Sequence, residues 1–180
     1  ANYYKAPDTR AYADMRAAGA RHDRITFDWF RLQPMPGPFT TTVTAAYDAV
    51  LADAAAAEIE TLGVLIGAPG WARDPALAGG AYYLPRHLER PWDDPENYWG
   101  QFVHQVVTRY KDRVRAWEVW NEPNLNEFWP APMPLYARLL QVAYQAAKSA
   151  DPSTTVVLGG LFRGVNIERI DALFKALRDL

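Results

Sequence analysis

The stretch Ala116-Trp117-Glu118-Val119-Trp120-Asn121-Glu122 decides the fold. We expect a strand over residues 116–120 that ends at Asn121-Glu122. Upstream, Asp94-Pro95-Glu96 predicts the N-cap and first turn of a helix, and the apolar residues that follow share one helical face. Downstream, residues 134–150 predict another helix. A strand between two helices indicates βαβ units and a parallel sheet.

The same alternation extends along the whole chain. Three further strands are predicted, at residues 24–29, 64–67 and 155–159. Three further helices are expected at about 8–19, 43–61 and 167–180. The run 64–67 is wholly apolar, as expected of a parallel strand covered on both faces. The sequence therefore predicts an α/β fold with four parallel strands and about five helices.

The composition is that of a globular domain. The chain has 180 residues, 49% hydrophobic and 22% charged, with a net charge of −2 and no cysteine. The near-neutral balance disfavours nucleic acid as a partner, and no apolar run reaches the roughly 18 residues of a membrane span. Aromatic residues make up 13%, which suits a large core and also a cleft for sugars. With no low-complexity linker, residues 1–180 are interpreted as a single domain.

The longest irregular stretches, about 31–42, 68–93 and 123–133, follow predicted strands. Parallel α/β folds place their active sites in loops at the carboxyl ends of strands. The loop lengths therefore favour an enzyme.

Residues 117–124, Trp-Glu-Val-Trp-Asn-Glu-Pro-Asn, closely resemble the strand-four signature of glycoside hydrolase clan A. Residues 125–129 and 136–152 look most like family 39, with cellulase-like family 5 next. Residues 24–29 are similar to the clan's second strand, and 67–71 to the end of its third. The resemblance covers about residues 8–160 and implies a (β/α)8 TIM barrel, present here as an incomplete barrel of about strands two to five.

The resemblance implies a retaining glycoside hydrolase that acts on β-linked sugars by double displacement. It assigns Glu122 as the general acid/base, and Asn121 as the residue that hydrogen-bonds the sugar 2-hydroxyl. Arg24 matches the arginine that pairs with the nucleophile. No metal or organic cofactor is implied, and the expected partner is an oligosaccharide or polysaccharide. A secreted or periplasmic location is favoured.

Four residues are candidates for substrate binding. Asp28 and Trp29 come at the end of the second-strand match, and Trp71 comes at the end of the third. Trp129 lies in the loop after the Asn-Glu-Pro motif. Core packing is the alternative for each tryptophan.

Other polar residues of the loops are weaker candidates. Arg73, Arg86 and Arg90 could meet an acidic sugar, although a solvated loop is favoured. The three histidines, His22, His87 and His104, show no metal-ligand spacing.

Retaining hydrolysis needs two carboxyl groups about 5–5.5 Å apart. Glu118 precedes Glu122 by four residues in one strand, or about 13 Å, so it is expected to be a barrel-interior carboxylate and a further partner of Arg24. In the clan the second carboxyl group is a glutamate at the end of the seventh strand, whereas this chain aligns with about strands two to five. The resemblance therefore implies that the nucleophile glutamate is missing from this chain. Three explanations for a partial barrel remain open: a partial sequence of a larger enzyme, an excised or recombined piece, and a natural half-barrel completed by a partner. The unpaired edges of such a sheet would favour association with another chain.

Two hypotheses compete with the hydrolase. The first is a non-catalytic carbohydrate-binding pseudoenzyme that uses the cleft aromatics without chemistry. The second is an open α/β fold for another ligand, disfavoured because no glycine-rich phosphate loop follows a strand.

Overall fold

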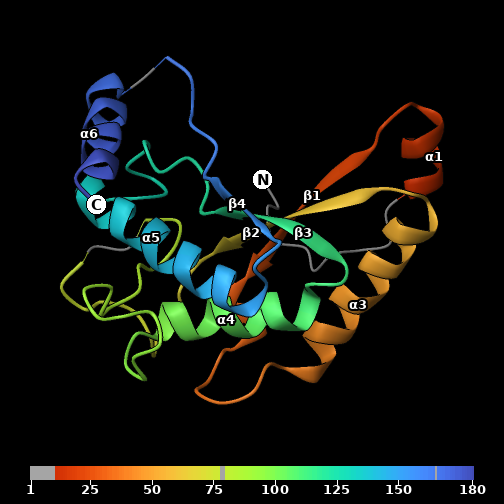
Figure 1. Cartoon of the computed structure of the whole chain (residues 1–180), viewed down its shortest axis with the longest axis horizontal. Helices are drawn as coiled ribbons and strands as arrows, with labels where there is room; N and C mark the ends of the chain where they lie inside the picture. The colour runs from red at the N-terminus through yellow and green to blue at the C-terminus, as the bar shows by residue number, and fades with distance from the viewer. Residues whose placement is uncertain (1–10, 78–79, 165) are drawn as a thin grey trace.

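The computed structural model describes residues 11–77, 80–164 and 166–180, where four strands alternate with helices (Figure 1). The strands are β1 (His22–Asp28), β2 (Glu60–Ile66), β3 (Val114–Val119) and β4 (Thr155–Leu158). The helices are α1 (Tyr12–Ala17), α2 (Trp29–Leu32), α3 (Thr41–Ala56), α4 (Tyr98–Tyr110), α5 (Met133–Ala150) and α6 (Ile167–Arg178). Among the described residues, no helix has the length and apolar character needed to cross a bilayer.

The strands lie in the order β1-β2-β3-β4, and each neighbouring pair is parallel. This order runs in one direction along the sheet and never reverses. A doubly wound sheet reverses its strand order at a switch point, whereas a (β/α)8 barrel does not. The prediction of four parallel strands of an α/β barrel is therefore confirmed for the described residues.

Aromatic packing joins the sheet to the helices on its outer face. Phe27 of β1 stacks on Tyr47 of α3 at 4.3 Å between ring centroids, and its ring also meets Tyr110 of α4 and Trp117 of β3. In Figure 1, α3, α4 and α5 run along the same side of the strands. Because side chains alternate along a strand, Arg24 and Glu118 lie on the opposite face, which corresponds to a barrel interior.

The largest boundary error of the sequence-based prediction lies between α3 and β2. The helix predicted over 43–61 ends at Ala56, and the strand predicted over 64–67 begins already at Glu60. Glu58 adopts a left-handed backbone with φ of 56°, which a helix cannot continue through. The short α2 was not predicted, and Trp29 opens it instead of ending β1.

The start of α4 also differs from the prediction. Asn97 is the N-cap, since its side chain accepts a hydrogen bond from the Gly100 N–H at 3.0 Å. The predicted cap, Asp94, instead accepts from the Glu96 N–H in the preceding turn. Of the first predicted helix, 8–19, α1 accounts for Tyr12–Ala17, and residues 8–10 lie outside the described residues.

Candidate active site

The end of β3 has an unusual backbone. Trp120 and Glu122 both adopt left-handed conformations, with φ of 71° and 42°. Such conformations cost roughly 1–3 kcal/mol each for residues other than glycine, and they persist only where neighbouring structure enforces them. Here the Trp120 N–H donates to the Leu65 carbonyl of β2, and the Glu122 N–H donates to the Gly160 carbonyl after β4. β2 and the segment after β4 therefore fix the direction of Asn121 and Glu122.

An ion pair crosses the interior face of the sheet. Arg24 Nε donates to Glu118 Oε2 at 2.6 Å, and Arg24 Nη2 donates to Glu118 Oε1 at 2.8 Å. The two residues belong to β1 and β3, so the pair spans β2, whose Val64 is in register with Glu118. Glu118 is buried and also accepts the Gly160 N–H at 2.7 Å. The hydrogen bonds to Glu118 raise the pKa of Arg24 above its ordinary value, so its charge is secure at any relevant pH. The pairing predicted for Glu118 and Arg24 is confirmed.

The three predicted catalytic residues form one hydrogen-bonded chain. Arg24 Nη2 donates to Asn121 Oδ1 at 3.0 Å, and Asn121 Nδ2 donates to Glu122 Oε2 at 3.4 Å. Because the guanidinium is only a donor, it fixes which end of the Asn121 amide faces Glu122. Glu122 is half-buried and therefore retains access to solvent.

The loop after Glu122 is anchored by a residue of the same motif. Asn124 is fully buried; its Nδ2 donates to the Phe162 carbonyl and its Oδ1 accepts the Phe162 N–H. Arg169 of α6 donates to three loop carbonyls, those of Pro123, Trp129 and Ala131. These anchors were not predicted, because their partners lie about 40 residues away in the sequence.

Trp29 and Trp129 do not occupy the predicted sugar-binding positions. Both side chains are 0% exposed. Trp29 stacks on Phe102 of α4 at 4.9 Å, and Trp129 packs edge-on against Trp120 at 5.3 Å. A ring enclosed on all sides cannot stack on a sugar, so the predicted binding role is corrected to core packing for both.

Trp71 remains a candidate for ligand contact. It is half-buried, and its Nε1 donates to the Gln33 carbonyl at 3.0 Å. Together with Tyr98 it lines a hollow of about 500 Å³ beside the start of α4.

Asp28 is a buried carboxyl group at the end of β1. It is 5% exposed, and Arg31 Nε lies 3.6 Å from its Oδ2. Burial raises the pKa of Asp28 to about 6, while the Arg31 charge opposes the rise. Its Oδ1 has no hydrogen-bond partner among the described residues. Asp28 is thus buried beside Arg31 in the described part of the chain. Its contact with substrate stays a prediction.

The loop arginines are engaged within the protein. Arg90 pairs with Asp94 and Glu96 at 3.3 and 2.8 Å. Arg73 and Arg86 lie over tyrosine rings, at 4.9 and 5.1 Å from the ring centroids. Within the described part of the chain, no group of histidine and acidic side chains could hold a metal ion.

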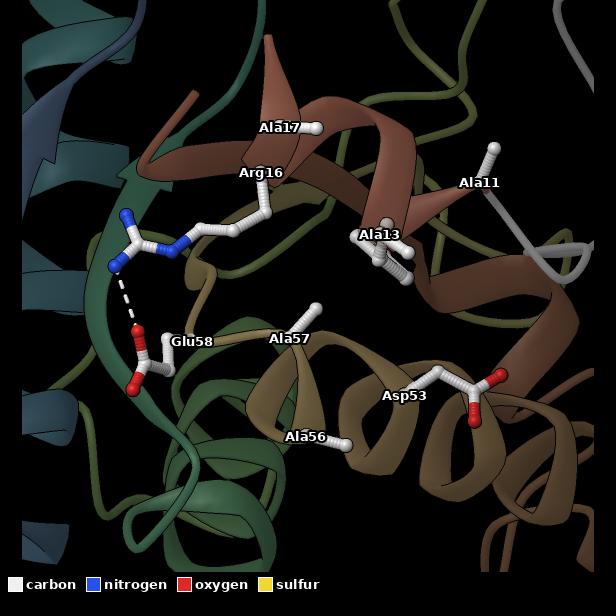
Figure 2. A pocket seen from close by; sticks show the side chains of 9 residues that line it. Ala11, Ala13, Arg16, Ala17, Asp53, Ala56, Ala57 and Glu58 are labelled. Atoms are coloured by element: carbon white, nitrogen blue, oxygen red, sulfur yellow. Dashed lines mark hydrogen bonds and ion pairs between the residues drawn. The ribbon is translucent and has the colours of Figure 1, made fainter. Parts of the chain in front are cut away.

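A hollow of about 740 Å³ lies between α1 and the last turn of α3 (Figure 2). Alanines line most of it, and an Arg16–Glu58 ion pair of 2.6 Å stands at one side. The two helices lead into the amino ends of β1 and β2. Barrel enzymes place their catalysis at the opposite end of the strands, so this hollow is not part of the candidate active site.

Known structures define the class of fold. A family 39 glycoside hydrolase from Bacteroides cellulosilyticus WH2 aligns with a TM-score of 0.64 and 23% identity, over 87% of this chain and 30% of that one. An endoglucanase from Thermotoga maritima aligns with a TM-score of 0.61 and 20% identity, over 88% of this chain and 46% of that one. The fold is that of part of a TIM barrel, which both of these neighbours share.

The chain is also similar in sequence to two β-xylosidases. A β-xylosidase from Caldicellulosiruptor saccharolyticus is 37% identical over 114 residues, 58% of this chain and 22% of the relative. One from Geobacillus stearothermophilus is 38% identical over 92 residues, 45% of this chain and 18% of the relative. No protein-family model matches the chain. The chain spans about a fifth of the length of these curated relatives. It is a homologue of β-xylosidases, with structural neighbours in glycoside hydrolase families 39 and 5, as the clan A resemblance predicted.

Proposed function

We propose that this chain supplies the acid/base part of the active site of a retaining β-glycosidase. The observation that carries the proposal is the hydrogen-bonded chain from Arg24 through Asn121 to Glu122. It stands at the carboxyl end of β3, in a fold that positions catalytic groups at the carboxyl ends of strands. The sequence relatives named β-xylosidase support a glycosidase.

In the proposed reaction, Glu122 transfers its proton to the glycosidic oxygen as the bond to the anomeric carbon breaks. A second carboxylate forms a bond to that carbon and gives a covalent glycosyl-enzyme. Glu122, now ionised, then takes a proton from the water that displaces the carboxylate. Asn121 donates to the sugar 2-hydroxyl through the amide N–H that is not engaged with Glu122, because the contact with Arg24 occupies the amide oxygen.

The second carboxylate is proposed to lie outside these 180 residues. Glu118 cannot serve, because Arg24 and the Gly160 N–H occupy both of its oxygens. Arg24 Nη1 donates to none of the described residues, so one edge of the guanidinium remains available for another carboxylate. This supports the proposed role of Arg24 as the partner of the nucleophile.

The test uses an enzyme in which this chain is joined to the rest of its barrel, with aryl β-xylosides as the first substrates. Glu122→Gln should lower kcat roughly 10²–10⁴-fold on a poor leaving group. It should have much less effect on kcat/KM for a dinitrophenyl xyloside, because that leaving group departs without protonation. The kcat for this substrate should still fall, because Glu122 also activates the water of the second step, and azide should restore kcat by replacing that water. Glu127→Gln, an exposed glutamate in the same loop, is the matched control. Equal losses of kcat/KM on both substrates, with no azide rescue, would remove Glu122 from the acid/base role.

A further inference from the structure

A second feature of the catalytic end of the sheet is a small aromatic hollow of about 340 Å³. Its lining comes from the segments that follow β1 and β2. None of the lining residues carries a charge. Three are aromatic, Phe30, Tyr82 and Tyr83, and the others are the small residues Ala68, Gly70, Gly80 and Ala81. The sequence does not predict this hollow, because Tyr82 and Tyr83 lie in a long loop without a periodic pattern.

The floor of the hollow depends on Gly67 at the end of β2. Its φ is 77°, and an added Cβ would lie 2.8 Å from the Tyr82 ring and 3.0 Å from the Phe30 ring. The Phe30 N–H donates to the Gly67 carbonyl at 3.1 Å. Only glycine allows both rings to approach the strand end so closely, so the two aromatic walls are held at fixed positions.

The outer wall is tied to the strands on two sides. The Ala68 N–H donates to the Tyr83 carbonyl at 3.0 Å, and the Ala81 N–H donates to the Glu127 carbonyl at 2.7 Å. These bonds attach the tyrosine segment to the end of β2 and to the loop after β3. The hollow is therefore formed before any ligand arrives.

The hollow lies close to the end of β3, which carries the acid/base residues. The Tyr82 ring lies 6.0 Å from the ring of Trp120 and stacks on Phe128 at 6.3 Å between centroids. Trp120 directly precedes Asn121 and Glu122. A ligand held in the hollow would therefore lie near the strand end that carries the residues proposed to act on the glycosidic bond.

We propose that this hollow is a sugar subsite that receives one neutral pyranose unit of a β-linked oligosaccharide; the inference rests on the proposed glycosidase function. The C–H faces of a pyranose pack against aromatic rings, whose faces carry negative charge density. An uncharged lining suits a neutral sugar and offers no partner to a phosphate or a carboxylate. The volume lies at the small end of ligand pockets, so one ring fits and a longer segment extends toward Glu122.

The first test is binding of xylotetraose to this chain, followed by ¹H–¹⁵N NMR. Backbone signals of Ala68, Gly70, Gly80 and Ala81 should shift on titration. Tyr83 is 45% exposed, so Tyr83→Ala should leave the fold intact and weaken binding roughly tenfold through the lost stacking. Tyr144→Ala, which removes a 52% exposed tyrosine of α5 outside the hollow, should bind as the wild type does.

A second variant blocks the hollow instead of removing a wall. A Cβ at Gly70 would meet nothing within 4 Å, so Gly70→Leu should place its side chain in the hollow without disturbing the packing. It should abolish the shifts. Unchanged affinity in both Tyr83→Ala and Gly70→Leu, shifts confined to other surfaces, or no binding at millimolar sugar would each overturn the subsite.

The same titration separates the subsite from the proposed reaction. Glu122→Gln leaves the hollow unchanged, so binding should persist in it. If the whole enzyme shows no turnover that depends on Glu122 while xylotetraose still shifts the hollow residues, the proposed function fails and the subsite stands. If turnover depends on Glu122 and the hollow residues do not respond, only the subsite fails.

Discussion

Replacing Asp28 by asparagine should stabilise the protein at neutral pH and have little effect in acid. Burial raises the pKa of this carboxyl group to about 6, from an ordinary value of 3.8. The folded protein therefore holds the proton more tightly than the unfolded chain does. The stability that protonated Asp28 contributes is fully present below about pH 4 and is lost as the pH rises through about 6.

The size of this loss follows from the two pKa values. Their difference corresponds to roughly 3 kcal/mol, reached above about pH 7. An asparagine side chain cannot ionise, so the Asp28→Asn variant should escape this loss. For a chain of this size, each kcal/mol moves Tm by roughly 2–4 °C. The Tm of the variant should therefore gain about 6–12 °C on the wild type between about pH 4 and pH 8.

The assay is urea unfolding followed by tryptophan fluorescence, at several pH values between about 4 and 8, the range that spans both pKa values. The measured quantity is the difference in free energy of unfolding between the Asp28→Asn variant and the wild type. Groups that titrate in both proteins cancel in this difference, so its change with pH reports Asp28 alone. Asp53→Asn, which removes an exposed carboxylate of α3, is the matched control for the loss of one acidic side chain. A flat difference for Asp28→Asn would mean that Asp28 does not titrate near pH 6, and the burial argument would be wrong.

Three further substitutions test the packing around the candidate site by urea unfolding. Gly63→Ala should lower the free energy of unfolding by about 1–3 kcal/mol, because the added Cβ would lie 2.5 Å from the Trp117 ring. The control Gly70→Ala places its Cβ in open space and should lower it little. Equal losses in the two variants would refute the close approach at Gly63. Tyr136→Phe should cost roughly 1–3 kcal/mol, because the hydroxyl bridges the ends of β3 and β4 from a buried position; a neutral result would remove that bridge. Glu118→Gln should lower the free energy of unfolding by roughly 2–4 kcal/mol, because the Arg24 guanidinium would lose its counter-charge. A loss below about 1 kcal/mol would mean that the pair contributes no more than an exposed ion pair does.

The sequence predicted the elements that are regular in themselves. Residues 134–150 give α5 within one residue of the observed bounds, Met133–Ala150. The apolar run 64–67 correctly indicated a buried parallel strand, although it covers only the end of β2. The start of β2 could not be predicted from Glu60 to Gly63, because these residues become a strand by pairing with β1 in register from His22 to Ile25.

In the candidate site, too, residues within a local sequence pattern could be predicted, and those whose surroundings come from distant segments could not. The motif located Asn121 and Glu122, and the pairing of Glu118 with Arg24 followed from their strand positions. The tryptophans could not be assigned from the sequence, because a large apolar ring suits a core and a sugar cleft equally well. Trp29 is enclosed by Phe102, which lies far along the chain in α4, so its burial is a property of the tertiary structure.

The left-handed backbone at Trp120 and Glu122 gives the motif its geometry, and all four strands contribute to holding it. β2 accepts the Trp120 N–H, and the segment after β4 accepts the Glu122 N–H. β1 supplies Arg24, which β3 holds through Glu118 and which in turn orients Asn121. Two strained residues would relax if these contacts were absent. The position of the Glu122 carboxyl group is therefore set by the assembled sheet, and the residues of the motif alone would not produce it.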